Sequence, residues 1–238
     1  MRGFPVTGVV DTAGTGTPIP SGQRSNNRPG GGEIPWLGEL KSRCKDINMT
    51  TIRKAKARCP KTAADQKLAE ETWEKMLADT VQGRAGPPIE LEEFEMDKGL
   101  LVDTFGIYEC HGEALDSKVR VINNFKGNFA NYFAWMPSKL RYNGFSELRE
   151  AAGIIKQDWA EELIMGKADF KSAFKTLPVS LDQSWLGWAL VFCPEDGKLK
   201  GVPLYIQSFG SLGAVVAWYR TAMLVQQLMQ TLFGTIFF

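Results

Sequence analysis

The feature that most constrains the fold is a pair of strand-like runs joined by a tight turn in the C-terminal half of the chain. Residues 186–192 and 199–206 are rich in apolar side chains, and the segment between them reads PEDGK. Asp196-Gly197 is a residue pair typical of a two-residue turn, so it predicts a β-hairpin. A long apolar run over residues 212–232 follows and predicts a helix, with Val215, Val216, Tyr219, Leu224, Leu228 and Leu232 on its inward face.

Helix signals dominate the earlier part of the chain. Residues 41–58 are rich in Lys and Arg and weakly helical, which fits either a surface helix or a nucleic-acid-binding arm. Thr62 and Asp65 have the spacing of a capping box, ahead of a run whose apolar side chains share one helical face. We therefore expect a helix that begins at Thr62 and ends near Gly83.

Strand signals return further along. Residues 118–125 (KVRVINNF) alternate so that Val119, Val121 and Asn123 share one face, and residues 163–170 (LIMGKADF) predict a strand with Asp169 near its C-terminal end. Residues 145–157 predict a helix and residues 235–238 a final strand. Strands mixed with helices, with a hairpin in place of regular crossovers, favour the α+β class.

Composition limits the class of protein. The chain has 238 residues, 44% of them apolar, which is enough for one sizeable core. Its net charge of +1 indicates no particular partner, although residues 1–60 are basic and residues 61–113 acidic. The four cysteines are widely spaced, which favours free thiols in a reducing compartment. With no signal-like or membrane-spanning run in the sequence, we expect an intracellular protein of the cytoplasm or nucleus.

Three segments, in this order, resemble motifs of the reverse transcriptases of retroelements. The first is KVRVINNFKGNFAN, similar to the fingers motif; the second is KADFKSAFKTLPV, similar to the first palm motif; the third is QSFGSLGAVVAWYR, similar to the Phe-Gly loop and helix of the second palm motif. The segment WEKMLADTVQGRAGPP is similar to a leader helix in one branch of these polymerases. The match covers residues 60–238.

The resemblance implies a polymerase-type fold, with an antiparallel sheet packed on helices. We expect residues 1–40 to be a disordered Gly/Pro/Ser-rich tail, residues 41–160 to form leader helices and a fingers-like region, and residues 161–238 to form part of a palm. The implied activity is RNA-directed DNA polymerisation, and the implied partners are an RNA or DNA template-primer and deoxynucleoside triphosphates. The oligomeric state stays open.

The resemblance also implies residue roles. Nucleotidyl transfer uses two Mg²⁺ or Mn²⁺ ions held by carboxylates. Asp169 would bridge both metals, with the Phe170 carbonyl assisting one of them. Lys118 and Arg120 would bind the triphosphate, because a guanidinium can bond two phosphate oxygens at once.

Three further residues would face the nucleotide. Phe174 would pack beneath the sugar and exclude a 2′-hydroxyl, while Phe209 and Gly210, with Ser208, would line the nucleotide loop. Each of these residues also has an ordinary structural interpretation, as a turn-capping Asp, a surface Arg, a core Phe or a turn Gly.

The chain departs from the family pattern in two places. Asn123-Asn124 stands where the family has acidic residues, which removes a carboxylate that would orient Arg120. The family's next motif is an aromatic-x-Asp-Asp hairpin, and the sequence stops at Phe238, where that motif would begin. One carboxylate cannot hold two divalent ions, so we expect the chain alone to be inactive.

Two other functional interpretations fit the same residues. The chain could be a non-catalytic nucleic-acid-binding or scaffold protein that keeps a polymerase-like palm. It could also be an unrelated α+β domain in which the motifs arose by chance, in which case Asp169, Phe174 and Gly210 would not converge.

Overall fold

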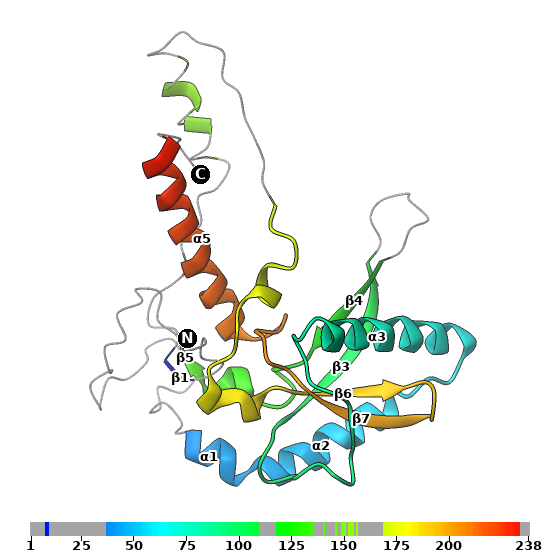
Figure 1. Ribbon diagram of the computed structural model, residues 1–238. Coiled ribbons are helices and arrows are strands. Elements are labelled where there is room, and N and C mark those ends of the chain that lie inside the picture. The colour runs from blue at the N-terminus through cyan, green and yellow to red at the C-terminus, as the bar shows by residue number, and fades with distance from the viewer. Residues whose placement is uncertain are drawn as a thin grey trace.

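The protein is built around a five-stranded mixed sheet with helices on both faces (Figure 1). The computed structural model describes residues 8–9, 37–109, 118–135, 140, 146, 149–150, 152–154, 156 and 169–233. The sheet has the order β2-β7-β6-β3-β4, with the strands β2 (Ile89–Glu90), β3 (Leu101–Glu109), β4 (Lys118–Asn123), β6 (Trp188–Cys193) and β7 (Lys198–Pro203). This combination of a mixed sheet and packed helices is consistent with the α+β class predicted from the sequence.

Helices and short 3₁₀ turns accompany the sheet. The helices are α1 (Leu37–Ser42), α2 (Cys44–Ala57), α3 (Ala63–Val81) and α5 (Leu212–Phe233), and the 3₁₀ turns are η1 (Ala130–Phe133), η2 (Ala173–Thr176) and η3 (Leu181–Leu186). A separate two-stranded pairing joins β1 (Gly8–Val9) to β5 (Ala134–Trp135). Within the described ranges, no helix is both long and apolar enough to cross a lipid bilayer.

The helices α2 and α3 cover opposite faces of the sheet. Trp73 and Met76 of α3 pack against Ala189 and Val191 of β6, whereas Ile52 of α2 packs in the cluster that contains Leu190. Successive strand residues point to opposite faces, so the two helices lie on either side of β6. Figure 1 shows the same three layers, with α3 above the sheet and α2 below it.

The N-terminal end of α3 forms as the sequence predicts. The Thr62 hydroxyl accepts a hydrogen bond from the Asp65 backbone N–H at 3.1 Å, and Asp65 Oδ2 accepts one from the Thr62 N–H at 3.1 Å. This capping box satisfies backbone donors that the first helical turn leaves free. At the other end, Gly83 has a φ of +68°, the left-handed conformation that commonly ends a helix.

A buried asparagine fastens α2 to the sheet. Asn48 is fully buried, and its Nδ2 donates to the carbonyls of Met96 and Gly99 at 2.8 and 2.7 Å. Its Oδ1 accepts the Leu101 backbone N–H at 2.8 Å. On the other side of the same residue, the Leu101 carbonyl accepts from Asn128 Nδ2 at 3.1 Å. The start of β3 is therefore held by side-chain amides along the edge that faces away from β6, which β4 does not reach.

The Asp196-Gly197 hairpin is confirmed. Strands β6 and β7 pair antiparallel from Trp188↔Pro203 to Cys193↔Lys198, and Gly197 has a φ of +70°. Charged side chains brace the turn, because Lys200 Nζ lies 2.7 Å from Asp196 Oδ2 and 3.1 Å from Glu90 Oε1. The ammonium group lowers the pKa of the Asp196 carboxyl to about 2.

Several expectations differ from the structure. The sheet is mixed and not antiparallel, because β3 and β6 run parallel. It also joins β3 and β4, from the expected fingers-like region, to β6 and β7, from the expected palm. Helix α1 begins at Leu37, inside the expected 1–40 tail, because Leu40 is fully buried in the core.

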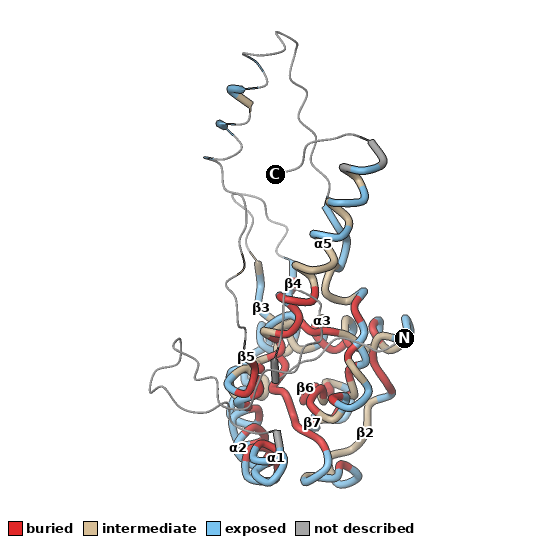
Figure 2. Tube along the Cα trace, turned by 90° about the vertical axis from the view of Figure 1, so that its left-hand side faces the viewer, coloured by how far each residue is buried: buried red, intermediate tan, exposed pale blue. Residues whose placement is uncertain are grey.

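The expected inward face of α5 is only partly right. Val216 is fully buried, but Val215, Leu224 and Leu228 are 37%, 56% and 51% exposed. The reason is visible in Figure 2, where α5 leads away from the buried body of the sheet and is exposed or half-buried along most of its length. Of the strand expected at 163–170, only Asp169 and Phe170 are described, and they are not in a strand. In the helix expected at 145–157, the described residues 146, 149–150, 152–154 and 156 are all helical. Cys110 and the strand expected at 235–238 lie outside the described residues.

We predict that Asn48→Ala destabilises the fold by about 2–5 kcal/mol. It removes the partner of the buried Leu101 N–H and of the Met96 carbonyl, and it leaves the Gly99 carbonyl with only the Cys44 thiol as a donor. Chemical denaturation followed by far-UV circular dichroism measures the change. The matched control is Asn124→Ala. Within the described part of the chain, Asn124 Oδ1 accepts only the Gly127 N–H of its own turn, at 2.9 Å. This control should cost about 1 kcal/mol or less. Equal losses in the two variants would contradict the role assigned to Asn48.

A second prediction concerns acid stability. The folded-state pKa of Asp196, about 2, lies below its ordinary value of 3.8. The Asp196–Lys200 pair therefore stabilises the fold fully above the ordinary value, and this stabilisation is lost as the pH falls through about 2. Asp196→Asn keeps a good turn residue and removes the charge. Its stability deficit in urea denaturation should be constant from neutral pH to about pH 5 and shrink toward pH 2. A deficit that does not change with pH would exclude this pair as its cause.

Candidate functional site

Three of the motif segments identified in the sequence meet in space through aromatic and cationic side chains. The rings of Phe174, from η2, and Phe209, from the loop before α5, lie edge to face with centroids 5.7 Å apart. The Arg120 guanidinium, from β4, lies over the Phe209 ring, with Cζ 5.4 Å from its centroid. We call Arg120, Phe209 and Phe174 the aromatic–arginine stack.

The stack has one exposed ring and one exposed cation. Phe209 is 45% exposed, and the Arg120 side chain is 44% exposed. A guanidinium over an aromatic face is attracted by the ring electrons and keeps its N–H edge available for acceptors. The stack therefore offers a flat apolar surface and a cation side by side.

A carboxylate on the neighbouring strand orients Arg120. Glu109 Oε2, at the end of β3, accepts hydrogen bonds from Arg120 Nη2 at 2.7 Å and Nε at 3.1 Å. From Asn123-Asn124 we had expected Arg120 to lack an orienting acid. The structure supplies one from a residue that the motif comparison did not consider, because β3 and β4 are antiparallel neighbours.

The two asparagines have structural roles. Asn123 is buried, and its Oδ1 accepts from the Thr104 hydroxyl at 2.8 Å. Asn124 closes a turn through its bond to Gly127. A buried carboxylate at position 123 would lie away from water, whereas the neutral amide does not carry that desolvation cost.

Gly210 fixes the loop that carries Phe209. Its φ is +105°, and a Cβ atom at this position would lie 2.3 Å from the Asn123 carbonyl oxygen. Asn131 holds the same loop, since its Nδ2 donates to the Gly210 carbonyl and its Oδ1 accepts from the Leu212 N–H, both at 2.8 Å. Only glycine permits both this conformation and this approach to β4.

The segment just before η2 lies against α5. Asp169 is exposed, and the ring of its neighbour Phe170 packs edge to face on Trp218, with centroids 5.1 Å apart. Lys118 is exposed on β4, directly opposite Glu109 in the strand register. The stack therefore brings together Arg120, Phe174 and Phe209, with Gly210 next to Phe209 in the same loop. Among the described residues, no hydrogen bond, ion pair or ring contact joins Asp169, Phe170 or Lys118 to the stack.

A salt-bridge network that the sequence did not reveal holds η2 in place. Lys175, next to Phe174, forms an ion pair with Asp79 of α3, and Arg84 lies 3.7 Å from the same carboxyl group. Asp79 is 7% exposed, so removing either cation would leave a nearly buried negative charge less well compensated. Lys175 and Asp79 are 96 positions apart in the sequence, so no local sequence pattern predicts this contact.

The described residues do not by themselves fit the magnesium or manganese centre that the resemblance implies. Within the ranges that the structure describes, no three His, Cys, Asp or Glu side chains gather closely enough to hold a metal ion. Asp169 is the one carboxylate that the resemblance assigns to the metals. We therefore derive no chemical step through a metal from these residues.

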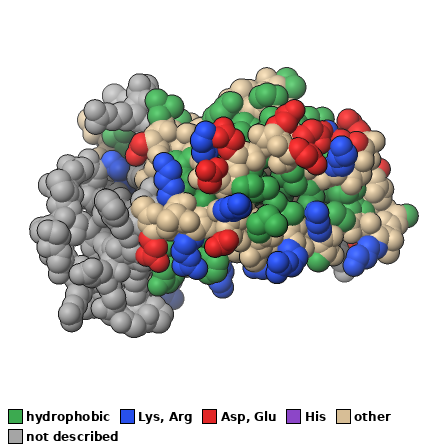
Figure 3. All heavy atoms as spheres, turned by 90° about the horizontal axis from the view of Figure 1, so that it is seen from below, with side chains coloured by type: hydrophobic (Ala, Val, Ile, Leu, Met, Phe, Trp, Pro, Cys, Tyr) green, Lys and Arg blue, Asp and Glu red, His purple; other side chains and the backbone are tan. Residues whose placement is uncertain are grey.

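The surface charge is mixed. On the face seen from below, Lys and Arg side chains alternate with Asp and Glu around a central apolar area (Figure 3). The basic side chains of α2, including Arg53, Lys54 and Lys56, are exposed, as expected for a surface helix. This arrangement does not by itself distinguish a surface helix from a nucleic-acid-binding arm.

No known protein family has a model that matches this chain, and no curated protein matches it.

We predict that Gly210→Ala disrupts the stack, because its Cβ would clash with the Asn123 carbonyl. The matched control is Gly83→Ala, since Gly83 also has a positive φ but nothing lies within 4 Å of a Cβ placed there. Gly83→Ala should cost about 1–2 kcal/mol through backbone strain alone. Gly210→Ala should cost about 1–3 kcal/mol more, through the clash. Denaturation measures both costs, and equal losses would show that the Asn123 contact does not constrain the loop.

Proposed function

We propose that this chain is part of an RNA-directed DNA polymerase domain, in which the aromatic–arginine stack contacts the incoming deoxynucleoside triphosphate. The observation that carries the proposal is the convergence of Arg120, Phe174 and Phe209. These residues come from three sequence motifs that are far apart in the chain, and each motif resembles a nucleotide-facing segment of reverse transcriptases.

The chemistry of the stack suits this ligand. A nucleoside triphosphate has a flat base attached to a sugar at one end, and several negatively charged phosphate oxygens at the other. The exposed Phe209 ring offers an apolar surface, and Arg120 offers a planar set of N–H donors that matches phosphate oxygens. Phe174 lies behind Phe209, where its bulk would act on the sugar, as the family resemblance implies.

The backbone around the stack is held in place before any ligand binds. Gly210 lies against β4, Asn131 bonds the same loop on both sides, and Lys175 fastens η2 to α3. A site whose side chains are already positioned loses less conformational entropy on binding. The proposed template is RNA, and a DNA primer paired to it is the proposed second partner.

The second candidate function is a non-catalytic nucleic-acid-binding protein. It is favoured by the pairing of Arg120 with Glu109, because a guanidinium already bonded to a carboxylate competes less well for phosphate. In that case the exposed aromatic rings would stack on nucleic-acid bases without selecting a nucleotide.

Equilibrium binding of dATP and ATP, followed by isothermal titration calorimetry with magnesium in the buffer, separates these functions. The polymerase proposal predicts tighter binding of dATP than of ATP. Arg120→Ala should weaken both by roughly tenfold to a hundredfold, the usual cost of a charge-assisted contact. Phe174→Ala should instead reduce the preference for dATP, because it removes bulk beside the sugar.

The matched control is Arg53→Ala, which removes an equal charge from the exposed face of α2. This variant should bind both nucleotides like the parent protein. If Arg53→Ala and Arg120→Ala behave alike, the stack is not the nucleotide site. Binding of an RNA–DNA hybrid without measurable binding of either nucleotide would favour the non-catalytic function.

A further inference from the structure

A second site lies where the central sheet divides. Strands β3 and β6 pair in parallel from Leu101↔Trp188 only as far as Asp103↔Leu190. Beyond that point β3 continues with β4, and β6 continues with β7. No ladder pair joins Thr104 to Gly106 with β6, so the two strands separate and leave a fork in the described sheet.

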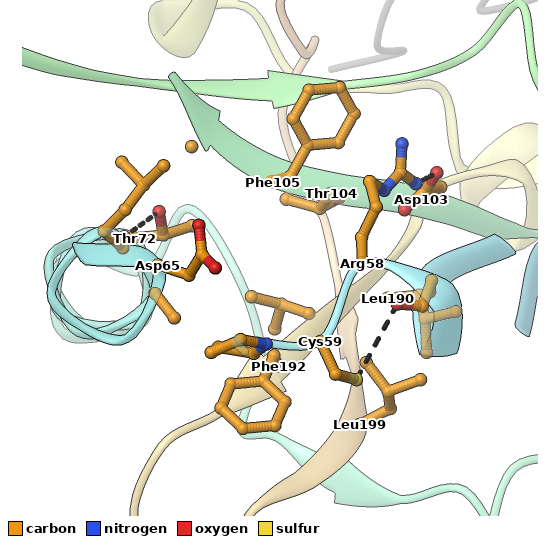
Figure 4. A pocket seen from close by; sticks show the side chains of 16 residues that line it. Arg58, Cys59, Asp65, Thr72, Asp103, Thr104, Phe105, Leu190, Phe192 and Leu199 are labelled. Carbon is orange, nitrogen blue, oxygen red and sulfur yellow. Dashed lines mark hydrogen bonds and ion pairs between the residues drawn. The ribbon is translucent and has the colours of Figure 1, made fainter. Parts of the chain in front are cut away.

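A cavity of about 260 Å³ fills this fork. The end of α2 and the first turns of α3 close it on either side, and it opens to solvent between them (Figure 4). Most of its walls are apolar, and the larger contributors are Leu68, Phe105, Leu190, Phe192 and Leu199. Apolar walls with a few fixed polar groups are typical of small-molecule sites.

An internal ion pair forms one side of the cavity. Arg58, at the end of α2, pairs with Asp103, which is only 4% exposed. The Arg58 guanidinium also lies over the Phe105 ring, with Cζ 4.4 Å from the centroid. The two opposite charges compensate each other, so this pair gives the cavity a rigid polar wall and no net charge.

Asp65 supplies the remaining charge. It faces the cavity from α3, across from Arg58 (Figure 4). Hydrogen bonds from the Thr62 hydroxyl and from the backbone N–H groups of Lys61 and Thr62 lower the pKa of its carboxyl, so it is an anion at neutral pH. No other lining residue forms an ion pair with it, and the cavity therefore carries one net negative charge.

We propose that the fork cavity binds a small organic cation that consists of one flat apolar ring and one ammonium group on a short chain. An apolar cavity of about 150 Å³ is enough to hold a benzene ring, so the fork has room for a ring and a two-carbon chain. The ring lies between Phe105, Phe192 and Leu68, and the ammonium group lies beside Asp65. This site is separate from the aromatic–arginine stack, and none of the stack residues lines it.

Three probes test the proposal; they share a phenylethyl group and differ in the charge of the group attached to it. They are 2-phenylethylamine, 2-phenylethanol and 3-phenylpropionate, each titrated into the full chain and followed by NMR chemical-shift changes. The amine should bind tightest, and roughly tenfold tighter than the carboxylate, as expected for one solvent-exposed charge contact that changes sign. Tightest binding of the carboxylate, or no binding of any probe at millimolar concentration, would overturn the proposal.

Two variants locate the site. Ala69 lines the cavity from α3, and Ala69→Leu should fill it and abolish binding of the amine. The matched control is Ala64→Leu, which makes the same change at an exposed position of the same helix and should leave binding unchanged. Asp65→Asn should reduce amine binding to the level of the alcohol. Thermal denaturation verifies that each variant is folded, and unchanged binding in a folded Ala69→Leu would also overturn the proposal.

Discussion

The contact between Gly210 and the carbonyl of Asn123 is the constraint on which the candidate site depends. It is a contact between two backbones, and it sets how closely the loop before α5 approaches β4. Because Phe209 is the neighbour of Gly210, this approach places its ring beneath Arg120 and beside Phe174. A Cβ atom at position 210 would meet this carbonyl, so the approach requires glycine whatever the side chains of the stack are. The backbone contact thus sets the position of the loop, and the side chains of Arg120, Phe174 and Phe209 then form the stack.

Hydrogen bonds and ion pairs from polar side chains join several helices, strands and loops of this fold. Asn48 and Asn128 satisfy the two backbone groups of Leu101, and Asn131 does the same for the loop at Gly210 and Leu212. Each amide supplies donors and an acceptor to backbone that no strand reaches. Asp79 and Asp103 similarly tie η2 and α2 to the body of the protein through Lys175 and Arg58. These contacts specify which segments meet, whereas the apolar clusters between the layers provide most of the driving force.

The sequence predicts the local elements well because their signals are local. The capping box at Thr62 and Asp65, the turn at Asp196-Gly197 and the alternation at Val119 and Val121 each depend on neighbouring residues. The parallel pairing of β3 with β6 could not be predicted in this way, because neither strand carries information about its distant partner. The same holds for Glu109 beside Arg120 and for the exposed stretch of α5, which depends on where the sheet ends. The resemblance led to Arg120, Phe174, Phe209 and Gly210, but only the structure relates them to Glu109 and Asn131.

The parallel pairing of β3 with β6 also determines when this protein can fold as it is made. Leu101, on the earlier strand, completes its core only with Leu190 and Leu199 of the later hairpin. A nascent chain that has delivered α2, α3, β3 and β4 therefore exposes apolar surface until the hairpin leaves the ribosome. Contacts of such long sequence separation slow folding and leave intermediates open to aggregation. A chaperone that shields the unpaired edge of β3 would therefore bind the nascent chain after β3 has been made and before β6 pairs with it.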